Sequence, residues 1–379
     1  MRITFILPGL ALAPGGGVRV VYRQANYLVQ RGHQVEIVFP YAVASLNAAQ
    51  AESASLRERF GKFLEWKRGR LAVAIRSARG ASLVWWLELD RRVKLNFVES
   101  LDQKNIPDAD AVIATFWRTA EYVAEYPAIK GEKFYFIQHY EIWGGPSDRV
   151  DATWRIPMHK VMGSKWLQSL GDEMGLTDMC YVPPGVDHQL FRIMAPPATR
   201  QRSVVGFYSC QPWKGTIDAV AVFERLHERY PALRLSMFGA ERPREGLPRW
   251  LKYYRNPRQE QLAREIYNTH SIYVCASHAE GWGLPPAEAM ASGCAVVSTD
   301  CGGVRDYAVD GETALLSPPK DRAALFDNLC RVLDDDALRL ALAERGTNCI
   351  REFTWERSGP LFEGYLCEVL AASRERGAA

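Results

Sequence analysis

The chain contains the stretch SIYVCASHAEGWGLPPAEAMA at residues 271–291. Its first six residues form an apolar run that predicts a buried strand. A loop with two glycines follows, and two prolines then begin an apolar helix that ends at Gly293. In α/β proteins, a strand followed by a glycine-containing loop and a helix start presents backbone N–H groups to an anion. The stretch therefore predicts an anion-binding turn in an α/β protein.

Two glutamates frame this loop, at positions 280 and 288. The glycines and prolines between them rule out one continuous helix, so Glu280 belongs to the loop and Glu288 to the first turns of the helix. A carboxylate accepts hydrogen bonds from hydroxyl groups. One acid in the loop and one a turn inside the helix therefore suit a ligand with many hydroxyl groups, bound across the helix N-terminus.

The beginning of the chain alternates strand and helix in the same way. Residues 3–7 are predicted to form a buried parallel strand, residues 18–29 a helix and residues 34–39 a second strand. This is the opening of a doubly wound sheet. The loop before the helix lacks the GxGxxG spacing of dinucleotide-binding proteins. Its Gly16 and Gly17 either let a ligand approach the backbone or simply make a turn.

The same pattern continues to the end of the chain. Residues 133–137 are a predicted strand, and His139 follows it, where open α/β sheets gather their ligand contacts. A purely structural histidine is the alternative. Residues 192–202 hold two prolines and little periodicity, and they are predicted to be a linker. Further strands and helices are predicted at residues 111–115, 203–208, 216–229, 233–238, 259–268, 272–276, 295–298, 313–316 and 321–333.

The fold class that follows is α/β, with two Rossmann-like doubly wound domains that face a central cleft. The first domain is predicted to span residues 1–191 and the second residues 192–359. A helix within residues 360–379 is expected to pack back on the first domain. A cleft between two such domains suits a ligand with a nucleotide at one end and a second substrate at the other.

Length and composition are those of a globular protein, and 379 residues are too many for one typical core. A net charge of +3 and the lack of zinc-finger or RNP-like spacing argue against a nucleic-acid partner. The eight cysteines are scattered without a CxxC pair, which indicates a reduced cytosolic setting. The apolar residues 3–12 are interpreted as a strand rather than a leader, because Pro14 disfavours cleavage. The predicted location is cytosolic, or peripheral at the inner membrane.

Residues 50–100 are rich in lysine and arginine, with aromatic residues such as Trp66 and Trp86 among them. A basic, aromatic surface can bind an anionic membrane weakly or receive an anionic acceptor. An ordinary solvated helix face, packed on its apolar side, explains the same pattern. Both interpretations stay open.

The residue types of the second half favour a nucleotide ligand. Lys214 precedes a glycine and a new helix, so its ammonium group can lie near a diphosphate. The backbone of Gly283 and Leu284 lies at the positive end of a helix dipole. Glu288 is expected to accept from the two hydroxyls of a ribose, and Glu280 from a sugar, or to lie beside a developing oxocarbenium ion. No histidine cluster suggests a metal site, so no metal or other cofactor is expected.

Glu280, Glu288 and the residues between them resemble the signature of the retaining family-four glycosyltransferases, which have the GT-B fold. The resemblance extends along nearly the whole chain. The other matching segments, in order, are Gly15-Gly16-Gly17, Arg31-Gly32-His33, Pro184-Gly185-Val186-Asp187 with Phe191, Lys214-Gly215, Gly302-Gly303-Val304 and Asp310-Gly311.

The resemblance implies a nucleotide-sugar donor, UDP-, GDP- or dTDP-linked, bound mainly by the C-terminal domain. It implies an oligosaccharide or lipid-linked glycan acceptor, bound mainly by the N-terminal domain. Glu280 would lie near the transferred sugar, Glu288 would hold the ribose, and His139 would line the sugar site. The family retains the anomeric configuration and uses no essential metal.

The chain departs from the family pattern where the first strand of the second domain ends. The family has a phosphate-binding arginine there, and this chain has Ser209. Lys214 alone, or an arginine from elsewhere such as Arg305 or Arg242, is then expected to neutralise the diphosphate.

The predicted function is transfer of a hexose or deoxyhexose from a nucleotide-sugar to a growing glycan, in bacterial surface polysaccharide biosynthesis. One alternative is a nucleotide-sugar epimerase or hydrolase of the same fold, which would turn over the donor without an acceptor. Another is a non-catalytic nucleotide-sugar-binding subunit. The intact glutamate pair argues against the latter, whereas Ser209 keeps it open.

Overall fold

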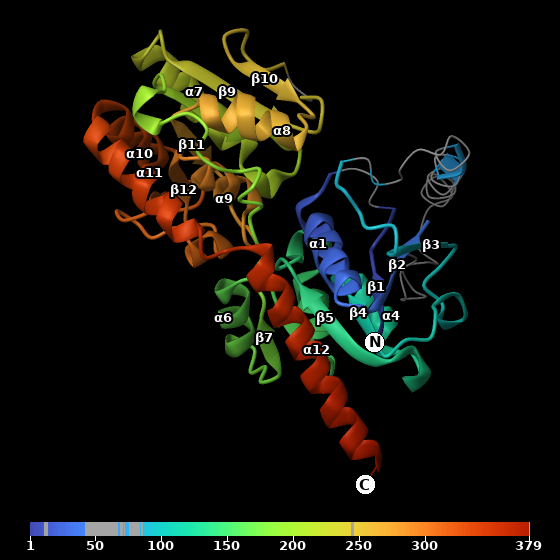
Figure 1. The fold of residues 1–379 in the computed structure, drawn as a ribbon. Coiled ribbons are helices and arrows are strands. Elements are labelled where there is room, and N and C mark those ends of the chain that lie inside the picture. Colours follow the sequence, from blue (N-terminus) through green and yellow to red (C-terminus); the bar gives the residue numbers. More distant parts are fainter. Residues whose placement is uncertain are drawn as a thin grey trace. The chain divides into compact units, whose positions relative to one another are not determined.

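The computed structural model describes residues 1–10, 14–41, 67–68, 71, 73–75, 84, 86–243 and 246–378. The chain divides into two compact units (Figure 1). Unit 1 comprises Met1–Gly163, Gln168–Val182 and Ser358–Ala379, and unit 2 comprises Ser164–Leu167 and Pro183–Arg357.

The first unit ends at Val182 and not after residue 191, where the sequence placed the boundary. The segment that follows Val182 is tied to a distant part of unit 2. Val186 forms a parallel bridge with Thr354, and its N–H donates to the Phe353 carbonyl at 3.0 Å. The ring of Phe191 packs on that of Tyr267, with 6.0 Å between centroids. The boundary was predicted from the prolines of residues 192–202, which are local features. The contacts that place residues 183–191 in unit 2 join distant parts of the chain, so a local pattern does not reveal them.

Unit 1 is built on a parallel sheet, which has seven strands among the described residues. Its central strand β4 is apolar and buried throughout, and β5 is apolar and buried from Phe134 onward, as expected when helices cover both faces. The sheet order is β3-β2-β1-β4-β5-β6-β7, so the winding direction reverses between β1 and β4. The strands are β1 (Arg2–Ile6), β2 (Gln34–Pro40), β3 (Lys94–Val98), β4 (Ala111–Ala114), β5 (Glu132–Ile137), β6 (His159–Met162) and β7 (Met179–Tyr181).

Four α-helices of the described residues follow these strands. The first helix begins at Gly16. The sequence predicted Gly16 and Gly17 in the loop before this helix, but both belong to its first turn. Gly15 precedes them in an extended conformation, and its carbonyl accepts from the Arg19 N–H at 2.9 Å. The helices are α1 (Gly16–Gln30), α4 (Trp117–Ala124), α5 (Ser147–Trp154) and α6 (Lys165–Glu173), with short 3-10 turns at Gln103–Asn105, Ala128–Lys130 and Ile142–Gly144.

The C-terminal helix α12 (Trp355–Ala378) packs on unit 1 from Ser358 onward (Figure 1, red). The ring of Phe362 lies 5.9 Å from that of Phe5 and 5.3 Å from that of Phe136. Beside it, the Glu363 carboxylate accepts from the Tyr27 hydroxyl at 3.0 Å and lies 2.8 Å from His33 Nε2. An aromatic contact and a polar cluster thus join the end of the chain to its beginning.

Unit 2 repeats the architecture with six parallel strands among its described residues. Their order is β10-β9-β8-β11-β12-β13, which is the 3-2-1-4-5-6 order of a Rossmann fold. The winding reverses between β8 and β11. The strands are β8 (Ser203–Phe207), β9 (Arg234–Gly239), β10 (Lys252–Arg255), β11 (Ile272–Cys275), β12 (Ala295–Thr299) and β13 (Ala314–Ser317).

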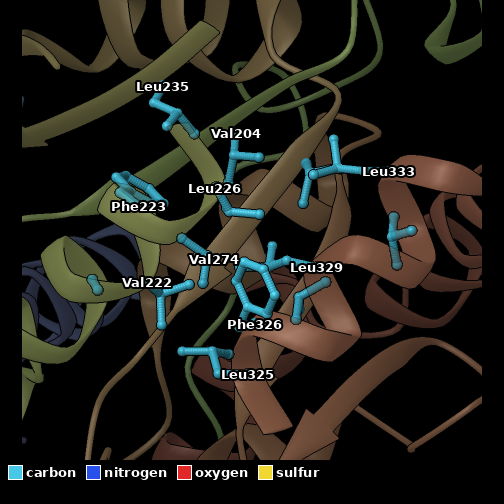
Figure 2. Close-up of a cluster of buried hydrophobic side chains, with 14 of the residues drawn as sticks. Val204, Val222, Phe223, Leu226, Leu235, Val274, Leu325, Phe326, Leu329 and Leu333 are labelled. Atoms are coloured by element: carbon cyan, nitrogen blue, oxygen red, sulfur yellow. The ribbon is translucent and has the colours of Figure 1, made fainter. Parts of the chain in front are cut away.

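The core of unit 2 lies between this sheet and two of its helices. Figure 2 shows Phe223 and Leu226 of one helix and Phe326 and Leu329 of another around Val274 of β11. Each such side chain contributes about 1.5–3 kcal/mol when fully buried. The helices are α7 (Thr216–Arg229), α8 (Gln259–Gln261), α9 (Leu284–Ala291), α10 (Arg322–Asp334) and α11 (Asp336–Ile350), with 3-10 turns at Pro197–Thr199, Pro212–Lys214, Tyr267–Thr269 and Gly303–Asp306.

Two strands and several helices were not predicted. β3 and β10 are the edge strands of their sheets, and each carries charged and polar residues. An edge strand faces solvent on one side, so its sequence lacks the apolar run that marks a central strand. The helices α4, α5 and α11 were also not assigned.

The predicted helix at 259–268 is interrupted. A π-helical turn at Leu262–Ile266 follows α8. Asn268 Nδ2 donates to the Ala263 carbonyl at 2.8 Å, while its Oδ1 accepts from the Met194 N–H at 2.7 Å. The side chain of Asn268 thus bonds to a main-chain carbonyl of the π-helical turn and links this turn to Met194. A hydrogen bond between residues so far apart in the chain cannot be predicted from the local sequence pattern.

No helix of the described ranges is long and apolar enough to cross a membrane. Most of the basic aromatic region predicted within residues 50–100, including Trp66, lies outside the described residues. Trp86 is described, and its ring lies 5.7 Å from that of Tyr22.

Candidate functional site

The site of unit 2 lies where its sheet reverses direction, at the carboxyl ends of β8 and β11. Open α/β sheets bind ligands at such a point, because two neighbouring loops separate there. The loop after β8 carries Ser209 and Lys214, and the loop after β11 carries Glu280. Residues that the sequence analysis named as donor-binding are therefore brought to one edge of one sheet.

Lys214 and Glu280 form an ion pair. The Lys214 ammonium donates to both carboxylate oxygens of Glu280 at 2.8 Å. The Ser277 hydroxyl donates to Glu280 Oε1, also at 2.8 Å. Glu280 is 7% exposed, so removing one partner would leave a charge that is poorly compensated.

The segment 301–303 holds the main chain of Glu280. The Glu280 N–H donates to the Cys301 carbonyl at 2.7 Å, and the Gly303 N–H donates to the Glu280 carbonyl at 2.9 Å. A Cβ at Gly303 would lie 2.0 Å from the Gly281 carbonyl oxygen. Gly302 has a φ of +92°, which favours glycine. The glycine pair predicted from the motif thus positions Glu280.

The loop then enters α9 through Gly283, whose φ is +89°. The Tyr307 hydroxyl donates to the Gly283 carbonyl at 2.6 Å and fixes this turn. Prolines at 285 and 286 have no N–H, so the start of α9 can offer N–H groups only from Gly283 and Leu284. The sequence analysis missed Tyr307, because it lies far along the chain from the turn it holds.

Glu288 lies one turn inside α9 and is 3% exposed. The Tyr267 hydroxyl lies 3.5 Å from its Oε2 and is directed to it as a donor. A buried carboxylate on a helix near its N-terminus is stabilised by the helix dipole. The position is the one that the motif spacing predicted.

Ser209 lies just after the end of β8, and its hydroxyl contacts a carboxylate. Its N–H donates to Thr216 Oγ1 at 3.0 Å, which joins it to the start of α7. Its hydroxyl lies 3.4 Å from Oε2 of Glu241, and the Cys210 N–H donates to the same oxygen. An acidic side chain, which the sequence analysis did not consider, thus lies at the position where a cation was expected.

Arg305 is exposed, and its guanidinium group is paired with an acid. It forms two hydrogen bonds with Asp300, from Nε at 2.5 Å and from NH2 at 2.7 Å. Its pKa is raised by this pairing. Arg242 follows Glu241 and is exposed, and its carbonyl accepts from the Cys210 thiol at 3.9 Å.

Asp218 of α7 links the loop after β11 to the start of α10. Its Oδ2 lies 2.6 Å from His278 Nε2, and its Oδ1 accepts from Arg322 Nε at 2.6 Å. Burial raises the pKa of Asp218, but these hydrogen bonds outweigh it and hold the pKa below its usual value. The His278 N–H donates to the Trp213 carbonyl at 2.7 Å. His278 stood in the quoted motif, yet nothing in the sequence indicated its partner.

Unit 1 carries the remaining predicted residues. His139 follows β5, and its Nδ1 lies 2.9 Å from the Tyr140 carbonyl and 3.3 Å from Trp143 Nε1. One tautomer satisfies only one of these contacts, since Nδ1 must donate to the first and accept from the second. A Cβ at Gly17 would lie 3.4 Å from Gln138 Oε1, so the small residue allows helix α1 to approach the end of β5.

The described residues contain no group of three or more His, Cys, Asp or Glu side chains that could hold a metal ion. The chemistry that unit 2 offers is one partly buried ion pair, a helix start with two N–H groups, and a buried carboxylate one turn further on. These groups can bind a phosphate and hydroxyl groups at neighbouring positions.

Part of the chain matches a known protein family. Residues 202–335 match the family model described as glycosyl transferases group 1. The D-inositol 3-phosphate glycosyltransferase of Corynebacterium urealyticum is 29% identical over 172 residues, which cover 41% of this chain and 40% of that protein. The chain thus spans less than half the length of the first curated relatives that it matches.

Solved structures resemble the chain over almost its full length. Sucrose-phosphate synthase from Thermosynechococcus elongatus has a TM-score of 0.71 at 16% identity, covering 98% of this chain and 99% of its own. Anabaena HepE, in complex with UDP-glucose, has a TM-score of 0.69 at 14% identity, covering 98% and 100%. The two parallel-sheet units and these likenesses confirm the predicted GT-B fold.

Proposed function

Residues 202–335 belong to the group 1 glycosyltransferases, and from this premise we propose that the protein is a retaining glycosyltransferase. Its donor is a nucleotide-linked hexose or deoxyhexose, and its acceptor is an oligosaccharide or a lipid-linked glycan. The observation that carries the proposal is the ion pair of Lys214 with the buried Glu280 at the reversal point of the unit 2 sheet, with Glu288 one turn inside α9.

Each group has a role in this proposal. The Lys214 ammonium and the N–H groups of Gly283 and Leu284 face the diphosphate, where negative charge develops as the sugar leaves. Glu288 accepts from the two ribose hydroxyls. Glu280 lies beside the sugar and stabilises positive charge at its anomeric carbon.

The transfer breaks the bond from the anomeric carbon to the diphosphate oxygen and forms a bond to an acceptor hydroxyl on the same face. The departing phosphate takes the proton of that hydroxyl. His139 of unit 1 is assigned to the sugar on the strength of the family resemblance. No resident metal has a role here, so transfer is expected to survive chelation with EDTA.

UDP-glucose is the first donor to test, because HepE was crystallised with it. The finer expectations are a place in bacterial surface polysaccharide biosynthesis and a cytoplasmic location, with weak contact to an anionic membrane. The last point would show as sedimentation with anionic vesicles that falls as salt rises.

The experiment is to measure release of UDP from UDP-sugar with and without glycan acceptors. We expect release that depends on an acceptor, with the product keeping the α-configuration of the donor. Glu280→Gln should lower the transfer rate by on the order of 10²-fold while UDP still binds. Glu344→Gln removes an exposed acid on α11 and serves as the control, with unchanged rate.

Donor turnover at the same rate with no acceptor would instead indicate a hydrolase or epimerase. Wild-type transfer by Glu280→Gln would remove the proposed role of this residue.

Glu288→Ala tests the ribose contact separately. It should weaken UDP binding by about 10- to 100-fold, the usual loss for hydrogen bonds to a charged group. Binding of inorganic pyrophosphate, which has no ribose, should change little. Equal loss for both ligands would show that the variant disturbs α9 and does not report on the ribose.

A further inference from the structure

The turn between β8 and α7 contains a carboxylate from another loop. The Glu241 side chain accepts a hydrogen bond from the Cys210 N–H, and its Oε2 lies 3.4 Å from the Ser209 hydroxyl. The Ser209 Oγ in turn accepts from the Gln211 N–H at 3.2 Å. Glu241 thus accepts hydrogen bonds from donor groups at the carboxyl end of the first strand of unit 2. An anionic ligand of this fold would bind to the same donor groups.

The fold holds Glu241 in this place. The Tyr253 hydroxyl donates to the Glu241 carbonyl at 2.6 Å. Just before it, a Cβ at Gly239 would lie 2.3 Å from the Tyr208 carbonyl oxygen, so the ends of β8 and β9 are in close contact. The main chain on both sides of the carboxylate is therefore fixed, although the side chain itself is exposed.

Two cations that were expected to neutralise the diphosphate are already paired. Lys214, five residues after Ser209, is hydrogen bonded to both oxygens of Glu280, and Arg305 to both oxygens of Asp300. The carboxylates of Glu241 and Glu288 add two further negative charges in this region of unit 2. A diphosphate entering the site therefore meets a field that does not favour a high negative charge.

We propose that Glu241 is a specificity-determining residue of the donor site, which competes with a phosphate for the donor groups of the β8–α7 turn. This rests on the proposed function. The ligand that it disfavours most is the one with the most charge. Free UDP has an ionised terminal phosphate at neutral pH and carries one more negative charge than UDP-glucose. Glu241 therefore weakens binding of the product more than binding of the donor, and it promotes release of UDP.

The test compares two ligands and two substitutions by calorimetry on the full chain. Glu241→Gln removes the charge but keeps an oxygen that can accept the same hydrogen bonds, and Glu241→Ala removes both. We expect Glu241→Ala to lower the Kd of UDP on the order of tenfold, with a smaller gain for UDP-glucose. Glu241→Gln should give an intermediate gain. Both gains should shrink as salt rises, because they arise from charge.

Glu344→Gln provides the matched control, since it removes the same charge from an exposed position on α11. Its Kd values should equal those of the wild type. UDP binding that is unchanged in both Glu241 variants would overturn this inference and leave the proposed function intact. An equal gain for UDP and UDP-glucose would also overturn it, because the selectivity would be absent. Failure of every protein to bind either ligand would instead contradict the proposed function, and the inference with it.

A double-mutant cycle gives a second readout. Ser209→Arg introduces a cation next to Glu241, where the two would form an ion pair. We expect this substitution to improve UDP binding little by itself and several-fold more in the Glu241→Ala background. Equal gains in both backgrounds would mean that Glu241 does not act at the phosphate position.

Discussion

Glu141 is a buried acid in unit 1 and shows how one residue makes stability depend on pH. It is 5% exposed, and its Oε2 accepts from the Trp117 N–H at 2.7 Å, at the start of α4. The Tyr135 hydroxyl lies 3.3 Å from the same oxygen. Burial raises the pKa of Glu141 to about 8, although both hydrogen bonds act in the opposite direction. The group therefore stays protonated in the folded chain at pH 7.

This pKa predicts a loss of stability with rising pH. Between about pH 4.5 and pH 8, the folded chain holds a proton on Glu141 that the unfolded chain releases. The free energy of unfolding of unit 1 should thus fall over this window, by on the order of 5 kcal/mol, and then level off. Glu141→Gln should remove this part of the slope in urea unfolding at pH 5.5, 7 and 8.5.

The control is Glu125→Gln, an exposed acid at the end of the same helix, which should keep the wild-type slope. If Glu141→Gln kept that slope as well, the acid would not be the group that titrates.

At the scale of the element, the loop after β11 is held by the turn after β8. Gly215 has a φ of +62°, and a Cβ there would lie 1.8 Å from the Ala276 carbonyl oxygen. This contact brings Lys214 beside Glu280 and lets the His278 N–H reach the Trp213 carbonyl. The ion pair of the site thus depends on a backbone contact that only glycine permits.

Gly215→Ala should therefore destabilise unit 2 by about 3 kcal/mol, from backbone strain and overpacking together. It should also weaken UDP binding, because Lys214 is displaced. Gly311→Ala is the matched control: its φ is +72°, but nothing lies within 4 Å of its Cβ. It should cost only about 1 kcal/mol and leave binding unchanged. Equal losses of stability in the two variants would mean that the approach to Ala276 is unimportant.

At the scale of the whole molecule, the chain returns to its first unit at the end. Ser358 and all that follows belong to unit 1, and Ser358 accepts from the buried Gln24 side chain at 2.8 Å. The start of α12 precedes this point and belongs to unit 2. One helix therefore contributes residues to both units.

Phe362→Ala should destabilise unit 1 by about 3–5 kcal/mol, because this ring is fully buried against Phe5 and Phe136. Hydrogen exchange should show lost protection in β1 and β5 and unchanged protection in β11 and β12. Leu361→Ala, at a neighbouring position that is 47% exposed, should change stability by no more than about 0.5 kcal/mol. Loss of protection throughout the chain would show instead that the two units unfold together.

The sequence by itself determined the central strands and the doubly wound fold class, and it placed Glu280 in a loop and Glu288 on the helix that follows. These follow from apolar runs, glycines and prolines, which act on neighbouring residues. It did not determine β3 and β10, whose edge positions leave no continuous apolar run, nor the π-helical turn that Asn268 induces. Only the tertiary structure decided that Lys214 pairs with Glu280, that Tyr307 holds Gly283, and that Glu241 occupies the turn beside Ser209. Such contacts join loops far apart in the chain, and no local pattern encodes them.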